Sequence, residues 1–183
     1  MERKKAVAAK DRSKHLTPQE SDVREQDFGL RIARDGTWFH HDSPIRRMPL
    51  VKLFASVLRR DEAGDHWLVT PAERGRIEVE DAPFLAVELT VEGRGMDQDI
   101  TFRTNVDDLV TADKAHPIRI VHDSATGEPA PYILVRDRLE ARIVRPVYYH
   151  LADLCEERRI DGRAVLGVRS GGTFFVLHAE EGS

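Results

Sequence analysis

The side chains that could do chemistry in this sequence are mainly arginines near the ends of expected helices and strands. Residues 46–60 hold five basic residues and no acidic one: Arg46, Arg47, Lys52, Arg59 and Arg60. Further basic groups fall at expected strand ends: Arg103, Arg119 and Arg136. A guanidinium group can hold an anion through two parallel hydrogen bonds, so these residues indicate anion binding. The alternative is a solvated helix face, because Asp61 and Glu62 follow directly.

The motifs of common catalytic and metal sites do not occur in the sequence. His40 and His41 are neighbours, which on a strand point to opposite faces, and no H-E-x-x-H is present. No G-x-S-x-G marks a catalytic serine, and Ser170 precedes two glycines typical of a hairpin turn. Cys155 lies on an expected apolar helix stripe, which favours a buried, inert thiol. We therefore expect no catalytic residue, metal site or cofactor.

Composition excludes several classes of protein. The 183 residues are 40% hydrophobic and 33% charged, which is typical of a soluble globular chain. A net charge of −4 supplies no overall positive field for nucleic acid. No run approaches the roughly 18 apolar residues of a membrane span. One cysteine excludes an internal disulfide, and the apolar stretch at residues 6–9 is too short for a signal peptide, so we expect a cytoplasmic protein.

The apolar patterns predict an α+β fold with mostly antiparallel strands. A helix is expected over residues 49–60, with Arg59 and Arg60 at its C-terminus and an apolar stripe at helical spacing: Leu50, Leu53, Phe54, Val57 and Leu58. A second helix is expected over residues 146–158. Strands are expected at residues 66–69, 76–80, 84–92, 99–103, 117–122, 132–135, 140–144, 164–169 and 173–177. Asp35-Gly36 predicts a two-residue turn that places Ile32 opposite Phe39.

The order of hairpin, proline, amphipathic helix and strand occurs twice. Aligning Pro49 with Pro146 sets apolar positions of the two helices on one another, for example Phe54 on Leu151. This pattern predicts two related halves from an internal duplication, although any two amphipathic helices agree at some core positions. We expect a polar, disordered tail over residues 1–27, a first α+β half over 28–112 and a second over 113–183.

Many short words of the sequence fall in the order seen in a known family. They include Asp35-Gly36-Thr37-Trp38-Phe39-His40, Ser43-Pro44-Ile45, Pro49-Leu50-Val51, Val57-Leu58-Arg59-Arg60, Trp67-Leu68-Val69-Thr70-Pro71, Glu80-Asp81-Ala82-Pro83-Phe84, Phe102-Arg103-Thr104-Asn105, His116-Pro117-Ile118-Arg119, Val147-Tyr148-Tyr149 and Ser170-Gly171-Gly172-Thr173-Phe174-Phe175. Over residues 28–177 the chain thereby resembles the bacterial domain-of-unknown-function family 1285. The resemblance implies a duplicated α+β core, a second half like pleckstrin-homology folds, a nucleotide-like ligand between the halves and a role in bacterial signalling.

The expected function is non-enzymatic binding of a small anionic, nucleotide-like ligand between the two halves. The residues expected to bind it lie at breaks in regular structure: Arg59, Thr70, Arg103, Asn105, His116 and Arg119. Arginines would supply charge, and the other three would supply directed hydrogen bonds. One alternative is a protein-interaction adaptor, which the exposed basic positions and Trp38 favour. Another is a hydrolase that uses His116 and a carboxylate.

Overall fold

The computed structural model describes residues 24–122 and 126–179, which form three sheets and two helices. The first sheet has the strand order β3-β2-β1-β6-β5-β4. Its strands are β1 (Arg24–Ile32), β2 (Trp38–His40), β3 (Ser43–Pro44), β4 (Leu58–Arg60), β5 (His66–Val69) and β6 (Glu73–Val79). Neighbouring pairs are antiparallel except β1 and β6, which run parallel.

The second sheet has the order β10-β11-β12-β7-β8-β9, and again one pair, β12 with β7, is parallel. Its strands are β7 (Phe84–Glu92), β8 (Asp99–Thr104), β9 (Leu109–Thr111), β10 (Ile118–His122), β11 (Pro129–Arg136) and β12 (Leu139–Ile143). The third sheet is an antiparallel meander of β13 (Glu156–Ile160), β14 (Arg163–Ser170) and β15 (Thr173–Ala179). The helices are α1 (Met48–Ser56), α2 (Arg145–Asp153) and the short 3-10 helix η2 (Gly95–Asp97).

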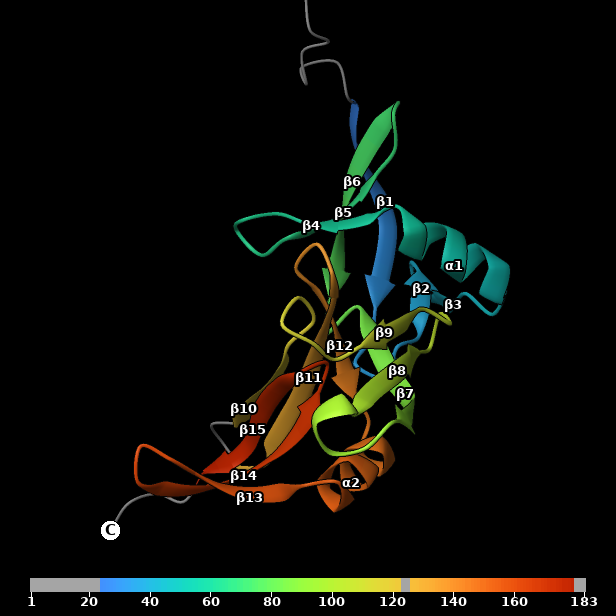
Figure 1. Ribbon diagram of the computed structural model, residues 1–183. Helices are drawn as coiled ribbons and strands as arrows, with labels where there is room; N and C mark the ends of the chain where they lie inside the picture. The colour runs from blue at the N-terminus through green and yellow to red at the C-terminus, as the bar shows by residue number, and fades with distance from the viewer. Residues whose placement is uncertain (1–23, 123–125, 180–183) are drawn as a thin grey trace, which may run out of the picture.

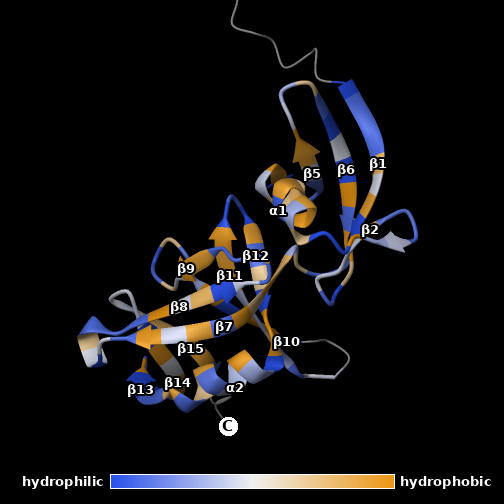
Figure 2. Cartoon of the chain, turned by 90° about the vertical axis from the view of Figure 1, so that its right-hand side faces the viewer, coloured by the Kyte–Doolittle hydropathy of each residue, from blue (hydrophilic) through white to orange (hydrophobic). Residues whose placement is uncertain are grey.

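The sheets divide the molecule into an N-terminal unit, residues 24–82, and a C-terminal unit, residues 83–179. The two units lie one above the other in Figure 1, with α1 beside the first sheet and α2 at the far end of the C-terminal unit. One core cluster of buried residues nevertheless runs through both units, from Leu30 to Leu177. β8 and the second half of β7 alternate between hydrophobic and hydrophilic residues, as strands with one face in a core do (Figure 2).

Both helices end earlier than the sequence predicted. Each begins with a proline in its first turn, where the missing N–H is not needed. α1 ends at Ser56 and the chain turns into β4, so Arg59 and Arg60 lie on a strand, not at a helix C-terminus. The buried face of α1 is Val51 and Ala55, whereas the predicted Leu53 is 59% exposed.

The first hairpin has a different register from the predicted one. Ile32 lies opposite Trp38 and Arg31 opposite Phe39, so the loop spans residues 33–37. The Asp35 carboxylate accepts the N–H of Thr37 at 2.9 Å, and the Ala33 N–H donates to the Thr37 carbonyl at 2.9 Å. A local aspartate turn therefore replaces the two-residue turn, which places Trp38 in the core at 1% exposure.

The start of the ordered chain and the inner boundary also differ from the expected positions. Residues 24–27, expected in the tail, pair with residues 73–76 of β6, and the rest of the expected tail lies outside the described residues. β1 is accordingly hydrophilic along its first half (Figure 2). The boundary expected at 112 and 113 falls between β9 and β10, which are the two edges of a single sheet.

The fold is α+β with a large excess of strands, as predicted, but the expected duplication and pleckstrin-homology likeness are not confirmed. Each helix follows a hairpin and leads into a three-stranded meander, so the order of elements repeats. The pairing does not repeat, because β6 joins β1 in one sheet while β13–β15 form a separate sheet. Among the described residues, no helix has the length and apolar character required to cross a bilayer.

Candidate functional site

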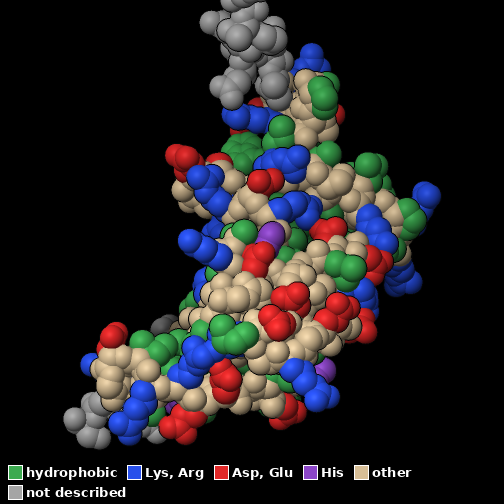
Figure 3. Space-filling model, viewed as in Figure 1, with side chains coloured by type: hydrophobic (Ala, Val, Ile, Leu, Met, Phe, Trp, Pro, Cys, Tyr) green, Lys and Arg blue, Asp and Glu red, His purple; other side chains and the backbone are tan. Residues whose placement is uncertain are grey.

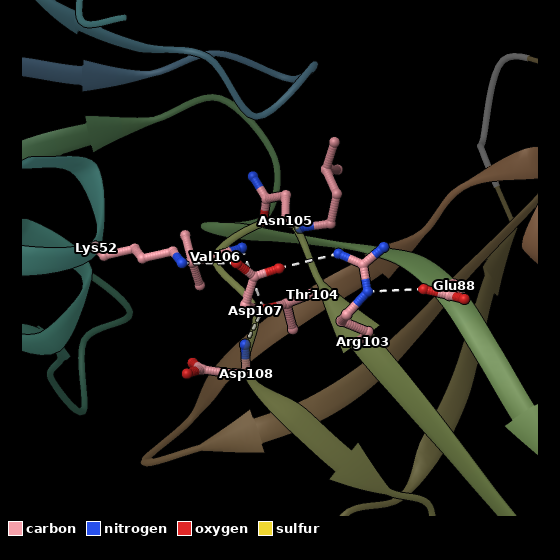
Figure 4. A network of polar contacts seen from close by, with 9 residues as sticks. Lys52, Glu88, Arg103, Thr104, Asn105, Val106, Asp107 and Asp108 are labelled. Carbon is pink, nitrogen blue, oxygen red and sulfur yellow. Dashed lines mark hydrogen bonds and ion pairs between the residues drawn. The ribbon is translucent and has the colours of Figure 1, made fainter. Parts of the chain in front are cut away.

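Two of the six predicted site residues, Arg103 and Asn105, lie in one network of polar contacts at the end of β8 (Figure 4). Arg103 donates to Glu88 at 2.7 Å and to Asp107 at 3.0 Å. Asp107 also accepts a hydrogen bond from Lys52 of α1 at 2.6 Å. These two donors hold the pKa of Asp107 below its ordinary value. Two of the three guanidinium nitrogens of Arg103, Nε and Nη1, thus donate to carboxylates of the chain itself.

Asn105 joins two strands of the second sheet rather than facing open space. Its side-chain oxygen accepts the N–H of Leu85 at 3.0 Å, and its own N–H donates to the Leu85 carbonyl at 2.9 Å. A Cβ atom added to Gly36 would lie 2.8 Å from the Asn105 amide nitrogen, so the first hairpin approaches it closely. Asn105 therefore has a structural role at the contact between the two units.

Arg59, Thr70 and His116 make mainly local contacts. Arg59 donates to the carbonyls of Ser56 and Leu58, at 3.1 and 2.7 Å. The Thr70 hydroxyl donates to the Glu73 carbonyl at 2.9 Å and accepts the Glu73 N–H at 3.1 Å, which closes the β5–β6 turn. The His116 ring lies 3.0 Å from the Asp113 carboxylate, in a turn that the same carboxylate organises.

Arg119 lies on β10 and forms a two-pronged ion pair with Glu140 of β12, with its Nη2 2.6 Å from that carboxylate. Its guanidinium also covers the Tyr132 ring, 4.5 Å from the ring centre. β10 is four strands away from β8 in the second sheet. Because adjacent strands lie about 4.8 Å apart, Arg119 and Arg103 are roughly 19 Å apart along the sheet. The structure therefore does not bring these two arginines together.

A cavity of about 590 Å³ lies elsewhere, at the junction of the two units. Arg34 enters it from the first hairpin, whereas Arg142 and Arg145 enter from the end of β12 and the start of α2. Tyrosines form much of the remaining wall: Tyr132, Tyr148 and Tyr149. None of the six predicted residues lines it or either of two further cavities, which are described below.

Glu80 and Asp81 are adjacent acidic residues at the junction, and each contacts a different unit: Glu80 contacts the N-terminal unit and Asp81 contacts the C-terminal unit. Glu80 forms an ion pair with Arg31 and accepts the backbone N–H of Arg34 at 2.9 Å. Asp81 accepts hydrogen bonds from the Tyr132 hydroxyl at 2.7 Å and from Arg142 at 2.6 Å. The positions of Arg34 and Arg142 at the cavity wall are therefore fixed by neighbouring residues of a single linker.

The protonation of the cavity tyrosines follows from their surroundings. Burial, together with the hydrogen bond to Asp81, raises the pKa of Tyr132 to about 12. Burial also raises the pKa of Tyr148. Both phenols are neutral hydrogen-bond donors at neutral pH. Three arginines face two carboxylates, Asp81 and Glu128, so the wall carries a small positive excess.

Two further cavities are less suited to an anion. A more open one of about 870 Å³ lies over β1 and β6, where three arginines are outnumbered by acids: Asp27, Asp42, Asp65, Glu78 and Asp81. The third, of about 470 Å³, lies between α1 and the C-terminal unit, and its Arg136 is held by Asp108 at 2.5 Å. The described residues contain no group of three or more His, Cys, Asp and Glu side chains arranged to hold a metal ion.

The family models match the chain in two adjacent parts. The N-terminal domain of DUF1285, a domain of unknown function, matches residues 17–82, and the C-terminal domain of the same family matches residues 83–177. The chain belongs to the DUF1285 family. This confirms the resemblance drawn from the sequence words. The DUF1285 boundary falls between residues 82 and 83, directly after the Glu80–Asp81 linker.

Solved structures of DUF1285 proteins have a similar fold. A crystal structure of a family member from Silicibacter pomeroyi DSS-3 is 47% identical, with a TM-score of 0.79, and the match covers 86% of this chain and 84% of that chain. One from Shewanella baltica OS155 is 23% identical with a TM-score of 0.53 over 68% of this chain and 90% of that chain, which shows the fold alone. A comparison with curated proteins found no match.

Sequence reasoning missed the DUF1285 cavity residues for an identifiable reason. Arg142 falls in the middle of the strand predicted at residues 140–144, whereas the binding residues are expected at breaks in regular structure. Tyr132 begins the strand predicted at residues 132–135, and Val147-Tyr148-Tyr149 lies in the predicted helix, but neither carries a site prediction. A signal is present in the sequence, since Arg145 directly precedes the predicted helix and Tyr148 and Tyr149 lie in its first turns.

Proposed function

We propose that this protein binds a small anionic ligand, without turning it over, in the junction cavity between its two units. The observation that carries the proposal is the convergence of Arg34 from the N-terminal unit with Arg142 and Arg145 from the C-terminal unit on one cavity of about 590 Å³. Small-molecule sites commonly have volumes of about 300–1,000 Å³ and lie between domains. The arginines can hold an anion in the two-pronged manner of guanidinium groups.

The aromatic wall favours an anion that carries a flat ring, as a nucleotide does. Tyr148 and Tyr149 line the cavity beside Arg145, at the start of α2, whose first turn contains no acidic residue. The positive pole of a helix N-terminus adds to the attraction of a phosphate group. A tyrosine face is suited to stacking on a ring. The expected ligand class is therefore nucleotide-like, with phosphate toward the arginines.

The Arg145 side chain is available to a ligand. Its ion pair with Glu128 spans 3.2 Å, and the two side chains are 68% and 65% exposed. Such an exposed pair contributes little, about 0–1 kcal/mol, so an anionic ligand can displace the carboxylate. Arg142 forms an ion pair with Asp81, which fixes the position of its guanidinium group in the cavity wall.

The hydrolase alternative has weak support in the geometry. His116 contacts Asp113, and Ser170, whose hydroxyl contacts Ala112, is a hydroxyl residue that could be tested as a nucleophile. The Ser170 hydroxyl donates to the Ala112 carbonyl at 2.6 Å and accepts the N–H of Ile100 at 2.8 Å. Because the backbone occupies the donor and one acceptor position of this buried hydroxyl, it cannot pass a proton to His116 without breaking structure.

A protein that binds a ligand without converting it can transmit a signal only if binding changes its own contacts with other molecules. The proposal therefore includes the role in bacterial signalling that the family resemblance implies. It also includes a cytoplasmic location. The junction is suited to such a response, because a ligand that bridges Arg34 and Arg145 would link the two units directly.

The proposal is tested by native mass spectrometry of the purified protein followed by thermal-shift titration. The probes are inorganic phosphate, pyrophosphate and a panel of nucleoside mono-, di- and triphosphates. We expect at least one nucleotide to raise the melting temperature. Loss of a charged hydrogen bond costs about 1.5–3 kcal/mol, so Arg145→Ala and Arg34→Ala should weaken binding roughly 10- to 150-fold.

Two sets of variants separate the cavity from the other possibilities. Arg94→Ala removes an exposed arginine from the β7–β8 turn and serves as the charge-matched control. Arg103→Ala and Arg119→Ala test the residues expected from the sequence. Loss of binding in those two variants with retention in Arg145→Ala would move the site away from the cavity. No shift with any probe would reject the ligand and favour the adaptor.

A further inference from the structure

The third sheet has an exposed edge. β13 is the outer strand of this sheet, and all five of its side chains are exposed. Figure 1 shows β13 along the lower margin of the molecule, with β14 and β15 on one side of it. An edge strand presents a row of unpaired N–H and C=O groups that can pair with another strand.

The turn after β13 determines which backbone groups face outward. Asp161 and Gly162 have φ angles of 51° and 80°, and Ile160 lies opposite Arg163. This is a two-residue turn of type I′, in which the Ile160 carbonyl faces β14. Because the direction of the backbone groups alternates along a strand, those of Glu157 and Arg159 point away from β14.

The side chains of β13 fall into two sets. Glu156 forms ion pairs with Arg158 at 3.1 Å and Arg169 at 3.3 Å, and Arg158 covers the Phe174 ring at 4.6 Å. Glu157 and Arg159 have no ion pair with any other described residue. They lie two residues apart and so share one face of the sheet. The two residues with outward backbone groups are therefore also the two with unused charges.

We propose that β13 pairs antiparallel with β13 of a second copy of this chain, about a two-fold axis at Arg158. In this register Glu157 lies opposite Arg159 of the partner subunit, and the reciprocal pair forms on the other side of the axis. Opposite charges on directly facing residues stabilise an antiparallel pair. The outward groups of the four residues supply backbone hydrogen bonds, and the two meanders become one six-stranded sheet.

Symmetry excludes most other registers. A two-fold axis normal to the sheet leaves each side chain on its own face, so two residues can lie opposite each other only if their side chains point to the same face. The axis must therefore pass between two copies of the same residue. An axis at Glu157 would place two carboxylates face to face. The proposed axis at Arg158 places only the two Arg158 side chains opposite each other, and each of these guanidinium groups already contacts Glu156 and Phe174 of its own chain. A parallel pairing would set equal charges side by side, which disfavours an in-register stack.

The proposal competes with the view that charges on an edge strand only prevent association. A single strand-to-strand junction buries less surface than a standard interface, so the expected dimer is weak. It should be measured by sedimentation equilibrium of the full chain, with concentrations reaching roughly millimolar.

The decisive experiment exchanges the charges. Glu157→Arg and Arg159→Glu each place like charges opposite one another, and each should raise the dimer dissociation constant at least about tenfold. The double variant Glu157→Arg/Arg159→Glu restores both opposite pairs and should dimerise as the wild type does. An equimolar mixture of the two single variants should form the heterodimer, because every facing pair is then complementary.

Arg94→Glu, at an exposed turn in another part of the chain, controls for the change in net charge and should not alter the dissociation constant. Unchanged melting temperatures show that the variants fold. A wild-type chain that stays monomeric over the whole series, or single variants that associate as strongly as the wild type, would overturn the proposal. Capture of a foreign strand by β13 without self-association would do the same.

Discussion

The two helix-and-meander segments of the molecule have the same order of elements but reach different sheets. After α1, the meander β4–β5–β6 joins the hairpin β1–β2 in one sheet, because β6 pairs with β1. After α2, the meander β13–β14–β15 remains a separate sheet. The difference originates in the hairpin β11–β12, whose outer edges are occupied by β10 and β7. No edge remains there for the second meander to join.

This comparison shows that the availability of a strand edge, rather than the local pattern, decides how a meander is placed. The strands that occupy the edges, β7 and β10, lie outside the repeated segment. The same fact leaves β13 open at the margin of the molecule. Repeated sequence patterns can therefore coexist with two different sheet arrangements.

The two helices are also fixed differently. α2 buries Leu151, which is fully inaccessible, and Val147 against the C-terminal core. α1 also buries two residues, the smaller Val51 and Ala55, and polar contacts tie it to the other unit: Lys52 with Asp107 at 2.6 Å and Arg136 with the Ala55 carbonyl at 2.8 Å. We expect changes to the apolar anchor to have the larger effects on stability.

The largest effect is expected for Leu151→Ala in α2. Truncation of a fully buried leucine removes apolar contacts and leaves a cavity, which costs about 2–5 kcal/mol of unfolding free energy. Urea denaturation measures the loss. Leu53→Ala, which truncates a leucine of α1 that is 59% exposed, is the matched control and should change stability by less than about 0.5 kcal/mol. Equal losses in the two variants would contradict the assignment of α2 as the apolar anchor.

A smaller, pH-dependent effect is expected in the N-terminal unit. Burial, with the nearby Arg60 charge, lowers the pKa of His66 from 6.5 to about 4, and its buried Nε2 has no hydrogen-bond partner among the described residues. The unfolded chain therefore binds a proton that the folded chain rejects. Stability is complete above about pH 6.5 and falls as the pH decreases toward 4.

The shift corresponds to an upper bound of roughly 3 kcal/mol, which the partial exposure of His66 reduces to about 1–2 kcal/mol. His66→Gln should flatten the decrease between pH 7 and pH 5, whereas His178→Gln, at an exposed position, should not. Hydrogen exchange at the two pH values localises the effect. We expect lower protection factors, which correct for the pH dependence of intrinsic amide exchange, in β5 and β6 at pH 5, with those of β14 unchanged; a uniform decrease would reject a local origin in His66.

Local patterns predicted most strands but not the end of either helix. β5 and β7 have the expected bounds, because their apolar residues alternate between clear turns. The sequence predicts helix through all of β4 and through residues 156–158 of β13. Leu58 and Cys155 continue a helical stripe, and nothing local shows that β5 and β14 draw these segments into sheets. Long-range pairing overrides local periodicity at both positions.

The candidate site was harder to predict because a charged side chain does not reveal its partners. The charge and position of Arg103 and Arg119 favour them as binding residues, yet Glu88 and Glu140 of the same sheet pair with them. The sequence does not indicate the cavity arginines, since only the folded junction brings Arg34 and Arg142 to one cavity. The sequence shows which charged residues the chain contains, whereas the register of the sheets determines which carboxylate pairs with which arginine.

The smallest effect is expected for Arg136→Lys, which tests how α1 is attached to the C-terminal unit. Arg136 of β11 reaches the Asp108 carboxylate at 2.5 Å with one nitrogen and the Ala55 carbonyl at 2.8 Å with another, so its fork clamps the C-terminus of α1 to the C-terminal unit. Arg136→Lys keeps the charge at the negative end of the helix but cannot make both contacts. We expect a loss of about 1 kcal/mol in unfolding free energy, from one charged hydrogen bond partly replaced by water.

Arg138→Lys is the matched control, because Arg138 also pairs across the junction, with Glu62, but the two side chains are 58% and 91% exposed. Its effect should be below the resolution of urea denaturation. The deficit of Arg136→Lys should persist in high salt, since much of it is the lost contact with an uncharged carbonyl. A deficit that vanishes in salt would show that α1 is held by charge alone, and one as large as that of Leu151→Ala would remove the distinction between the two helices.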